Sequence, residues 1–367
     1  MQHTNIAIVY LGDFFFDARC INMALSLQKE NAQISIICTY NQKFHTSKFQ
    51  NIKFYNIQIQ NRGIKKYWEF HSKVKQILSE RDFDTIISGD LYSLSSCCLS
   101  NNNAKIIYDC REIYTQLSAH YYKPIHKIFW NCYEHYFLKY VDTVLVTAIS
   151  DLKYLKIKFK NYKHLKWNVI YNYPYDYKLN MTISLKEKYN IPKDQYLVLY
   201  QGVIQKKRGI RQLLYVIQKS KNLIGVIIGS GNTTYYKNFA KQLKIIDKVI
   251  FINKINYLDL FNYTSACDVG WAVIQNFGIS NKNALPNKLF EYSLMGLPVI
   301  ASKLPNMKKI IIENNLGILV DDKNTEEHLK AINTLINNSS DYINREKIKN
   351  IFTWQAQHQL FINSIYE

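Results

Sequence analysis

The sequence predicts an α/β protein built from two doubly wound parallel-sheet domains. Short apolar runs alternate along the chain with amphipathic segments of helical length, and this alternation is typical of a parallel sheet covered by helices on both faces. The alternation pauses at a turn-rich stretch, residues 171–176, and then starts again. The 367 residues also suffice for two domains of ordinary size.

In the first half of the chain, uninterrupted apolar runs predict strands that are buried on both faces. The expected strands are Ile6–Leu11, Ile34–Cys38, Thr85–Ser88, Lys105–Tyr108, Thr143–Thr147 and Asn168–Tyr171. The helical segments between them are Ala18–Glu30, Lys66–Glu80, Tyr121–Tyr140 and Asp151–Phe159. Together these elements predict an N-terminal domain over residues 1–175.

The second half repeats the pattern, with apolar side chains at clean helical spacing in the segments between the strands. Its expected strands are Tyr196–Gln201, Leu223–Ile228, Val249–Ile252, Cys267–Trp271, Pro298–Ala301 and Gly317–Val320. We expect this domain to occupy residues 176–350, after a hinge near residues 172–185. A C-terminal helix follows in residues 351–367, and a return of this helix to the first domain stays open.

The charge of the chain is concentrated in one stretch. There are 47 basic and 28 acidic residues, a net charge of +19, and residues 151–250 hold 20 of the basic residues but only 5 of the acidic ones. Such a stretch favours an anionic partner, whether nucleic acid, phospholipid or a phosphorylated substrate. The alternative is compositional drift toward lysine, which explains many lysines but not the scarcity of acids.

The cysteines and the termini point to a reducing compartment. The seven cysteines are scattered and form no C-x-x-C pair, which argues against a disulfide framework and against a zinc site. The N-terminus lacks the basic region of a signal peptide, and no apolar run approaches the ~20 residues that span a bilayer. We therefore expect a cytoplasmic protein.

The most informative segment is residues 284–301, ALPNKLFEYSLMGLPVIA. Pro286 suits the first turn of a helix, and Gly296 suits its C-terminal cap. The backbone N–H groups near Lys288 and Leu289 would then lie at a helix N-terminus, which is a favourable site for phosphate. Glu291 follows one turn later, where its carboxylate could accept two hydrogen bonds from a ribose diol. The alternative for Glu291 is a cap or ion pair on a surface helix.

This segment resembles the donor-binding signature of the retaining glycosyltransferases of family 4, also called glycosyltransferases group 1, whose fold is named GT-B. The resemblance implies that Glu291 binds the ribose of a nucleotide sugar. Residues 200–209, YQGVIQKKRG, are similar to the family's glycine-rich loop, which implies that Gly202 belongs to the donor site and that Arg208 holds the diphosphate. Gly229 and Gly231 match the family's I-V-G-x-G strand end, where close approach of the backbone needs glycine.

Two positions depart from the family pattern. The family usually has two glutamates separated by seven intervening residues, of which the second is matched by Glu291 and the first contacts the transferred sugar. Asn283 stands at the place of the first and carries no charge. Many members also have arginine where this chain has Val203, so one diphosphate cation is missing at its usual place. The candidates to replace this cation are Lys206, Lys207 and Lys288.

The first half resembles the family through fewer residues. Residues 108–114, YDCREIY, are similar to the family's Y-D-x-H-E-x-[YF] segment, which implies cleft roles for Asp109 and Glu112 and places Arg111 where relatives have histidine. Together with Arg208, these three are the catalytic candidates. The alternative for Glu112 is a carboxylate that a helix dipole stabilises. Further candidates on the acceptor side are Gly12, taken as a flexible position, with Arg19 and Asp90.

The expected function is transfer of a sugar, with retention, from a nucleotide diphosphate sugar to a lipid-linked or surface-glycan acceptor. No D-x-D motif stands in a credible loop, so we expect neither a metal nor another cofactor. A nucleotide-sugar 2-epimerase of similar architecture is the alternative enzyme. A non-catalytic nucleic-acid-binding protein is the alternative from another class, but no nucleic-acid-binding module is recognisable, so no nucleic acid is expected as a partner.

Residues 151–167 suggest where the protein works. On a helix, Leu152, Leu155, Phe159 and Tyr162 form one stripe, and Lys153, Lys156, Lys160 and Lys163 form the next. A basic amphipathic helix of this kind binds an anionic membrane surface, which predicts peripheral association with the inner face of the membrane. The alternative is that the apolar stripe packs on the N-terminal sheet and the lysines are merely solvated.

Overall fold

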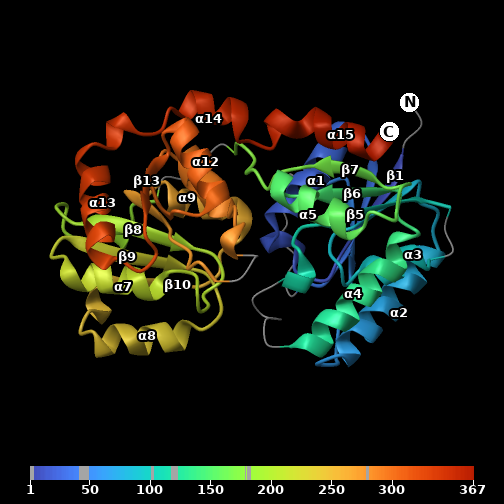
Figure 1. Ribbon diagram of the computed structural model, residues 1–367, viewed down its shortest axis with the longest axis horizontal. Helices are drawn as coiled ribbons and strands as arrows, with labels where there is room; N and C mark the ends of the chain where they lie inside the picture. Colours follow the sequence, from blue (N-terminus) through green and yellow to red (C-terminus); the bar gives the residue numbers. More distant parts are fainter. Residues whose placement is uncertain are drawn as a thin grey trace. The chain divides into compact units, whose positions relative to one another are not determined.

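In the computed structural model the chain forms two compact units (Figure 1). The structure describes residues 4–40, 49–100, 103–116, 123–177, 179, 183–277 and 281–367. The first unit comprises Met1–Asn172 together with Gln357–Glu367, and the second comprises Tyr173–Ala356. The chain therefore passes between the units twice, after Asn172 and after Ala356, whereas the sequence suggested boundaries after residues 175 and 350.

The first unit contains a seven-stranded parallel sheet in the order β3-β2-β1-β4-β5-β6-β7. The strands are β1 (Asn5–Tyr10), β2 (Gln33–Cys38), β3 (Ile52–Asn56), β4 (Thr85–Ser88), β5 (Lys105–Cys110), β6 (Thr143–Val146) and β7 (Lys166–Val169). Its helices are α1 (Ala18–Lys29), α2 (Lys65–Ser79), α3 (Leu94–Cys98), α4 (Pro124–Leu138), α5 (Ile149–Lys158) and α15 (His358–Tyr366), with 3₁₀ turns η1 (Phe14–Phe16) and η3 (Tyr114–Gln116). The strand order reverses between β1 and β4, which is where doubly wound sheets bind ligands.

The second unit contains a six-stranded parallel sheet in the order β10-β9-β8-β11-β12-β13. The strands are β8 (Tyr196–Gln201), β9 (Leu223–Ile228), β10 (Val249–Ile252), β11 (Val269–Ala272), β12 (Val299–Ser302) and β13 (Gly317–Val320). The helices are α6 (Leu185–Lys188), α7 (Ile210–Lys219), α8 (Thr233–Gln242), α9 (Tyr257–Thr264), α11 (Asn287–Leu294), α12 (Pro305–Asn314), α13 (Thr325–Asn337) and α14 (Arg345–Ile351), with 3₁₀ turns at Ile246–Lys248, Ser339–Asp341 and Gln355–Gln357. Two doubly wound parallel-sheet domains are thus confirmed.

Two elements of the first unit were not expected from the sequence. Strand β3 lies at the edge of the sheet, and its residues are mostly exposed or half-buried, so it carries no continuous apolar run. Helix α3 has only five residues, two of which are serines. Both elements form because the neighbouring sheet and helices hold them, and local sequence preference contributes little.

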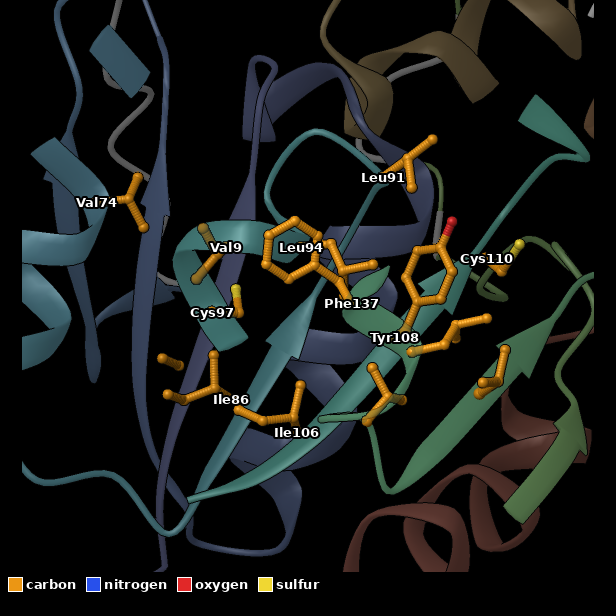
Figure 2. Close-up of a cluster of buried hydrophobic side chains, with 14 of the residues drawn as sticks. Val9, Val74, Ile86, Leu91, Leu94, Cys97, Ile106, Tyr108, Cys110 and Phe137 are labelled. Carbon is orange, nitrogen blue, oxygen red and sulfur yellow. The ribbon is translucent and has the colours of Figure 1, made fainter. Parts of the chain in front are cut away.

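A hydrophobic core of the first unit fills the space between its sheet and helices α2, α3 and α4. Figure 2 shows side chains from both sources in one cluster, with Val9, Ile86 and Ile106 from strands and Val74, Leu94 and Phe137 from helices. Burying each large apolar side chain contributes about 1.5–3 kcal/mol. This packing fixes the ends of β1, β4 and β5, where the candidate acceptor-side residues lie.

Helix α15 completes the first unit with residues from the far end of the chain. It lies against α1 (Figure 1), and Phe361 and Ile365 are almost completely buried. The His358 ring meets the Ser26 hydroxyl at 3.1 Å, and the Lys105 ammonium donates to the carbonyl of Ile365 at 2.9 Å. The C-terminal helix therefore returns to the first unit, which was the alternative left open above.

The expected basic stripe over residues 151–167 is wrong. Helix α5 ends at Lys158, so Lys160 and Lys163 lie beyond the helix and form no common face with Lys153. Leu155 and Phe159 are buried in the core of the first unit, which leaves the apolar stripe unavailable to a membrane. The alternative of packing on the N-terminal sheet is the correct one here. None of the helices in the described ranges is long and apolar enough to cross a bilayer.

Candidate active site

Three segments of the second unit meet at the carboxyl ends of its strands: the loop after β8, the loop after β9 and the N-terminus of α11. The N–H of Gly202 donates to the carbonyl of Ile228 at 2.9 Å, and residues 204 and 231 form an isolated parallel bridge. A Cβ on Gly229 would collide with the carbonyl of Gly202, and one on Gly231 with the carbonyl of Ile204. The sequence predicted a close approach of the backbone at Gly229 and Gly231. In this structure the loop after β9 makes that approach to the loop after β8.

Lys288 projects a buried ammonium group into this site from the first turn of α11. Its side chain is 8 % exposed, and its Nζ lies 3.6 Å from the centroid of the Tyr200 ring. This Nζ has no hydrogen-bond partner among the described residues. Burial lowers the pKa of Lys288 well below its usual value, and the nearby charge of Arg208 lowers it further. An anionic ligand at this place would supply the hydrogen-bond acceptor that the ammonium lacks.

Arg208 supplies a second cation beside Lys288. It is half-buried in the loop after β8, and its charge acts on both the Lys288 ammonium and the Tyr200 phenol. Within the part of the chain that the structure describes, no carboxylate forms an ion pair with Arg208. Two adjacent cations, with the Glu291 carboxyl group near Lys288 as the opposing charge, form a site suited to a diphosphate.

Glu291 lies one turn further along α11 and is also buried. Burial raises the pKa of its carboxyl group to about 7, against the opposing effects of hydrogen bonds from Gln201 and Tyr257 and of the Lys288 charge. The Gln201 side chain donates to Glu291 and accepts a hydrogen bond from the Thr264 hydroxyl at 2.8 Å. The orientation of Glu291 is therefore set by a chain of hydrogen bonds that reaches α9.

Gln201 was missed by the sequence interpretation. The signal was a polar residue at the end of the apolar strand β8, YLVLYQ, directly before Gly202. The hydroxyl of Tyr292 accepts the N–H of Gln201 at 2.9 Å and donates to the carbonyl of Leu199 at 3.0 Å. Strand β8 and helix α11 are therefore tied together directly beneath the site.

Helix α11 begins and ends where the sequence indicated. Pro286 occupies the N-cap position, and the N–H of Leu289 donates to its carbonyl at 3.0 Å, so Leu289 has its own partner within the helix. Gly296 has φ +86°, and its N–H and that of Leu297 close the helix end on the carbonyls of Ser293 and Tyr292. Asn283 lies in the loop before the helix, where its carbonyl accepts from the Asn306 amide at 2.7 Å.

In the first unit, four charged residues form a balanced cluster at the carboxyl ends of the strands. Arg19 forms an ion pair with Asp109 at 2.7 Å, and Arg111 forms ion pairs with Asp17 at 2.7 Å and with Asp109 at 3.0 Å. Asp109 is completely buried and Arg19 is 3 % exposed. The geometry favours a positioning role for these two residues, since neither presents a side chain to solvent.

Arg111 is the member of this cluster that reaches toward the surface, with 12 % of its side chain exposed. Its guanidinium lies 4.7 Å from the centroid of the Tyr10 ring. A Cβ on Gly12 would collide with that ring. Gly12 does not have a positive φ, so its role here is to make room for Tyr10.

The two remaining acceptor-side candidates have different surroundings. Asp90 is buried, and its carboxylate accepts the N–H groups of Leu11 at 2.9 Å and Ser93 at 2.7 Å. Burial raises the pKa of Asp90 although these hydrogen bonds oppose the shift. Glu112 is exposed and close enough to Tyr114 to help raise the pKa of its phenol. Asp90 thus joins two loops, whereas Glu112 faces solvent.

Residues 182–351, most of the second unit, match the family model described as Glycosyl transferases group 1. This part of the chain belongs to that family. The glycosyltransferase is 26 % identical over 346 residues to an uncharacterized glycosyltransferase from Haemophilus influenzae, and the match covers 88 % of this chain and 87 % of that protein.

Solved structures show that the fold of the glycosyltransferase is GT-B. Sucrose-phosphate synthase from Thermosynechococcus elongatus superposes with a TM-score of 0.77 at 16 % identity, covering 99 % of this chain and 98 % of that one. Anabaena HepE, solved in complex with UDP-glucose, superposes with a TM-score of 0.74 at 14 % identity, covering 99 % and 100 %. These likenesses extend over both units.

The structure thus groups the candidate residues of the glycosyltransferase into two sets, one in each unit. Gly202, Arg208, Lys288 and Glu291 lie together in the second unit, with Gly229 and Gly231 in its supporting loop. Arg19, Asp109 and Arg111 lie together in the first. The individual catalytic and binding roles stay predictions. No group of three or more His, Cys, Asp or Glu side chains suited to hold a metal ion lies within the described ranges.

Proposed function

We propose that the protein transfers a sugar, with retention at the anomeric carbon, from a nucleotide diphosphate sugar to a glycan acceptor. The observation that carries this proposal is the buried ammonium of Lys288, which has no hydrogen-bond partner among the described residues and lies beside Arg208. Two desolvated cations stabilise the negative charge that develops on a leaving diphosphate. Glu291, oriented by Gln201, accepts hydrogen bonds from the ribose hydroxyls.

We further propose that this chemistry needs no metal, since Arg208 and Lys288 themselves neutralise the diphosphate. Activity is then expected to survive an excess of chelator. Loss of activity in chelator, with recovery on adding magnesium or manganese, would contradict this part of the proposal.

A thermal-shift screen tests the donor site. UDP- and GDP-sugars are compared, since a ligand at 100 times its Kd adds about 2.7 kcal/mol of stability. At least one is expected to stabilise the wild type. Lys288→Met removes the buried charge while keeping an apolar side chain of similar length, and is expected to abolish the shift. Lys221→Met, at an exposed lysine outside the site, is the matched control.

Three outcomes would count against the proposal. If no nucleotide sugar stabilises the wild type, or if Lys288→Met responds like Lys221→Met, the donor site is wrongly assigned. If the donor alone is converted into an epimeric nucleotide sugar without any acceptor, the protein is an epimerase. In that case the nucleotide site would be retained and the transfer reaction would be refuted.

We also propose that the acceptor is lipid-linked and that the protein lies against the cytoplasmic leaflet through α4 and the start of α2. The outer face of α4 carries an apolar stripe, in which Ile125 is 79 % exposed and Ile128 is 65 % exposed. Phe129, Cys132 and Tyr136 continue the stripe, and all three are exposed. Residues at positions i, i+3, i+4, i+7 and i+11 share one face of a helix. An outward apolar stripe on a surface helix is unusual unless it meets a partner.

Helix α2 extends this surface. The rings of Tyr67 and Trp130 lie 5.4 Å apart, which places the N-terminal halves of α2 and α4 side by side (Figure 1). Trp68 is 70 % exposed at the start of α2. Two exposed lysines flank this surface, Lys65 on α2 and Lys123 before α4. Exposed aromatic and aliphatic groups with lysines beside them suit an anionic lipid surface.

Vesicle co-sedimentation tests the membrane surface. The wild type is expected to bind vesicles that contain anionic lipid at low salt, and to bind neutral vesicles less. Ile128→Glu is expected to reduce binding strongly, while Ile157→Glu, at an equally exposed position on α5, serves as the matched control. Absence of binding at low salt, or equal loss in both variants, would refute the surface.

A further inference from the structure

Arg208 stands between two residues whose backbones adopt the left-handed conformation. Lys207 has φ +69° and Gly209 has φ +76°. A non-glycine residue rarely adopts this conformation, and it persists only where neighbouring groups hold it. Here the carbonyl of Lys207 accepts the N–H of Gln275 at 3.0 Å, and the carbonyl of Gly209 accepts the indole N–H of Trp271 at 3.1 Å. The backbone position of Arg208 is therefore set by strand β11 and the segment that follows it.

Trp271 is the part of this support that lies in the sheet itself, and its side chain is completely buried. The Gly209 carbonyl also accepts the N–H of Leu213 at 3.1 Å, so the indole adds a second donor to a carbonyl that α7 already uses. A Cβ on Gly209 would collide with the carbonyl of Val273 and would lie 3.1 Å from the indole nitrogen. Because close-packed interiors transmit displacements, a shift of the indole would move the loop.

A side chain outside the donor site fixes the indole ring. The ring of His328 lies edge-on to that of Trp271, with the centroids 5.3 Å apart and an angle of 83° between the planes. His328 is completely buried on α13, and its Nε2 lies 2.7 Å from the carbonyl of Asp321, the residue after β13. Because a carbonyl only accepts, Nε2 carries the proton and donates it. This hydrogen bond holds the imidazole in place against the indole.

The second ring nitrogen of His328 indicates that histidine does more here than fill the core. Its Nδ1 is buried and has no hydrogen-bond partner among the residues that the structure describes. Burial lowers the pKa of His328, against the opposing effects of the Asp321 hydrogen bond and of nearby acidic side chains. A buried polar atom without a partner costs free energy, and an aliphatic side chain would fill this place without that cost.

We propose that His328 is a positioning residue of the donor site, although it lies outside that site. The imidazole fixes the ring of Trp271, whose N–H fixes the Gly209 carbonyl, and this carbonyl sets the backbone beside Arg208. The proposal rests on the function proposed above, because only there does Arg208 act on a diphosphate. A catalytic group displaced by about 1 Å can lose up to about 100-fold in rate, so distant support of this kind affects function.

Binding of UDP and GDP to the full chain tests this role without requiring sugar transfer. His328→Leu removes the hydrogen bond to Asp321 and the ring beside Trp271, and Trp271→Phe removes the indole N–H. Each variant is expected to weaken the nucleotide that the wild type binds by about tenfold, or about 1.4 kcal/mol, because Arg208 is misplaced. His328→Gln keeps an N–H donor for the Asp321 carbonyl and is expected to restore most of the affinity.

Two further variants separate positioning from simple packing. In an Arg208→Ala background, His328→Leu has no charge left to misplace, so it is expected to weaken binding no further. Leu335→Ala removes another completely buried side chain of α13, one that takes no part in this hydrogen-bond chain, and is expected to bind as the wild type does. Thermal unfolding confirms that each variant is folded. If His328→Leu does not fold, Trp271→Phe carries the same comparison.

The outcomes distinguish this proposal from the proposed function. If neither nucleotide binds the wild type, the donor site is refuted and the role of His328 with it. If a nucleotide binds but no sugar is transferred, the transfer reaction is refuted, and the variants still decide the role of His328. His328 is only a core residue if His328→Leu binds like Leu335→Ala, if His328→Gln loses as much as His328→Leu, or if the loss is undiminished in the Arg208→Ala background.

Discussion

Two buried groups of opposite charge, Lys288 and Glu291, lie within one turn of α11. Burial disfavours the charged form of each: it raises the pKa of Glu291 to about 7 and lowers that of Lys288 well below its usual value. A bound diphosphate would favour the ammonium form of Lys288, and ribose hydroxyl groups would favour the carboxylate form of Glu291. In the proposed donor site, binding of a nucleotide sugar would therefore be coupled to protonation at both residues.

The pH dependence of donor use follows from Glu291. Because its raised pKa leaves the carboxyl group protonated below about pH 7, the ribose loses a charged acceptor there. We expect kcat/KM for the donor to rise with pH up to about 7 and to fall again at the pH where Lys288 loses its proton. Glu291→Gln should lower the maximum and flatten the rise. If kcat/KM of Glu291→Gln still rose with pH as in the wild type, the rise would come from the titration of another group.

Substitutions at Glu291, which is proposed to bind the ribose, and at Arg208, which is proposed to bind the diphosphate, should separate donor binding from transition-state stabilisation. Glu291→Ala removes charge-assisted hydrogen bonds of ~1.5–3 kcal/mol, or about 10- to 100-fold in kcat/KM. Arg208→Ala should cost about 100-fold, mainly in kcat, because the leaving-group charge is largest in the transition state. Steady-state kinetics on the folded variants decide this, and wild-type rates in both would overturn the site.

Asn283→Glu probes the departure from the family pattern. Restoring a carboxylate before α11 should change which sugar is transferred, since a charged acceptor replaces a neutral amide at the residue matched to the sugar contact. Competition between two donors measures the preference. An unchanged preference would mean that Asn283 does not touch the sugar.

At the scale of elements, the sequence predicts buried strands well and edge elements poorly. Tyr196–Gln201 and Leu223–Ile228 were expected with their observed bounds, because strands buried on both faces must be apolar throughout. Strand β3 was missed because an edge strand needs apolar residues on one face only. The expected strand Asn168–Tyr171 is observed at Lys166–Val169, since this edge strand is only half-buried.

In the candidate site, the sequence likewise predicts residues that stand in one local pattern but misses contacts that only the fold creates. Lys288, Glu291 and Arg208 stand in one local pattern and could be found from the sequence. The burial of Asp109 could not, because Arg19, its partner, lies 90 residues away and only the fold brings the two together. The role of Gln201 also depends on its contacts with α9 and α11, and no local sequence pattern indicates these contacts.

Two glycines of the second unit should respond differently to a methyl group. Gly229→Ala would push its Cβ against the carbonyl of Gly202, so the loop after β8 must move and donor affinity should fall. Gly296→Ala has room for the Cβ but must hold φ near +86°, which costs about 1–2 kcal/mol of stability. Chemical denaturation and donor titration of both variants measure this. Equal effects on donor affinity would contradict the loop contact.

At the scale of the whole molecule, α15 links the end of the chain to the first unit. Phe361 is completely buried, so Phe361→Ala should cost about 3–5 kcal/mol of unfolding free energy. Leu360→Ala, at the neighbouring half-exposed position, should change it by less than about 0.5 kcal/mol. Denaturant titration compares the two. Similar midpoints would mean that α15 contributes little to the first unit.

The double passage of the chain sets an order of completion during synthesis. A ribosome delivers residues 1–172 first, yet the helix that covers α1 lies in Gln357–Glu367, which follow the continuous segment Tyr173–Ala356. The second unit can therefore close while the first still exposes the surface that α15 will cover. Domains usually fold in the order in which they are made. Here the unit that begins first is completed after the second, so a nascent chain stalled before residue 357 would hold a complete second unit and an unfinished first unit.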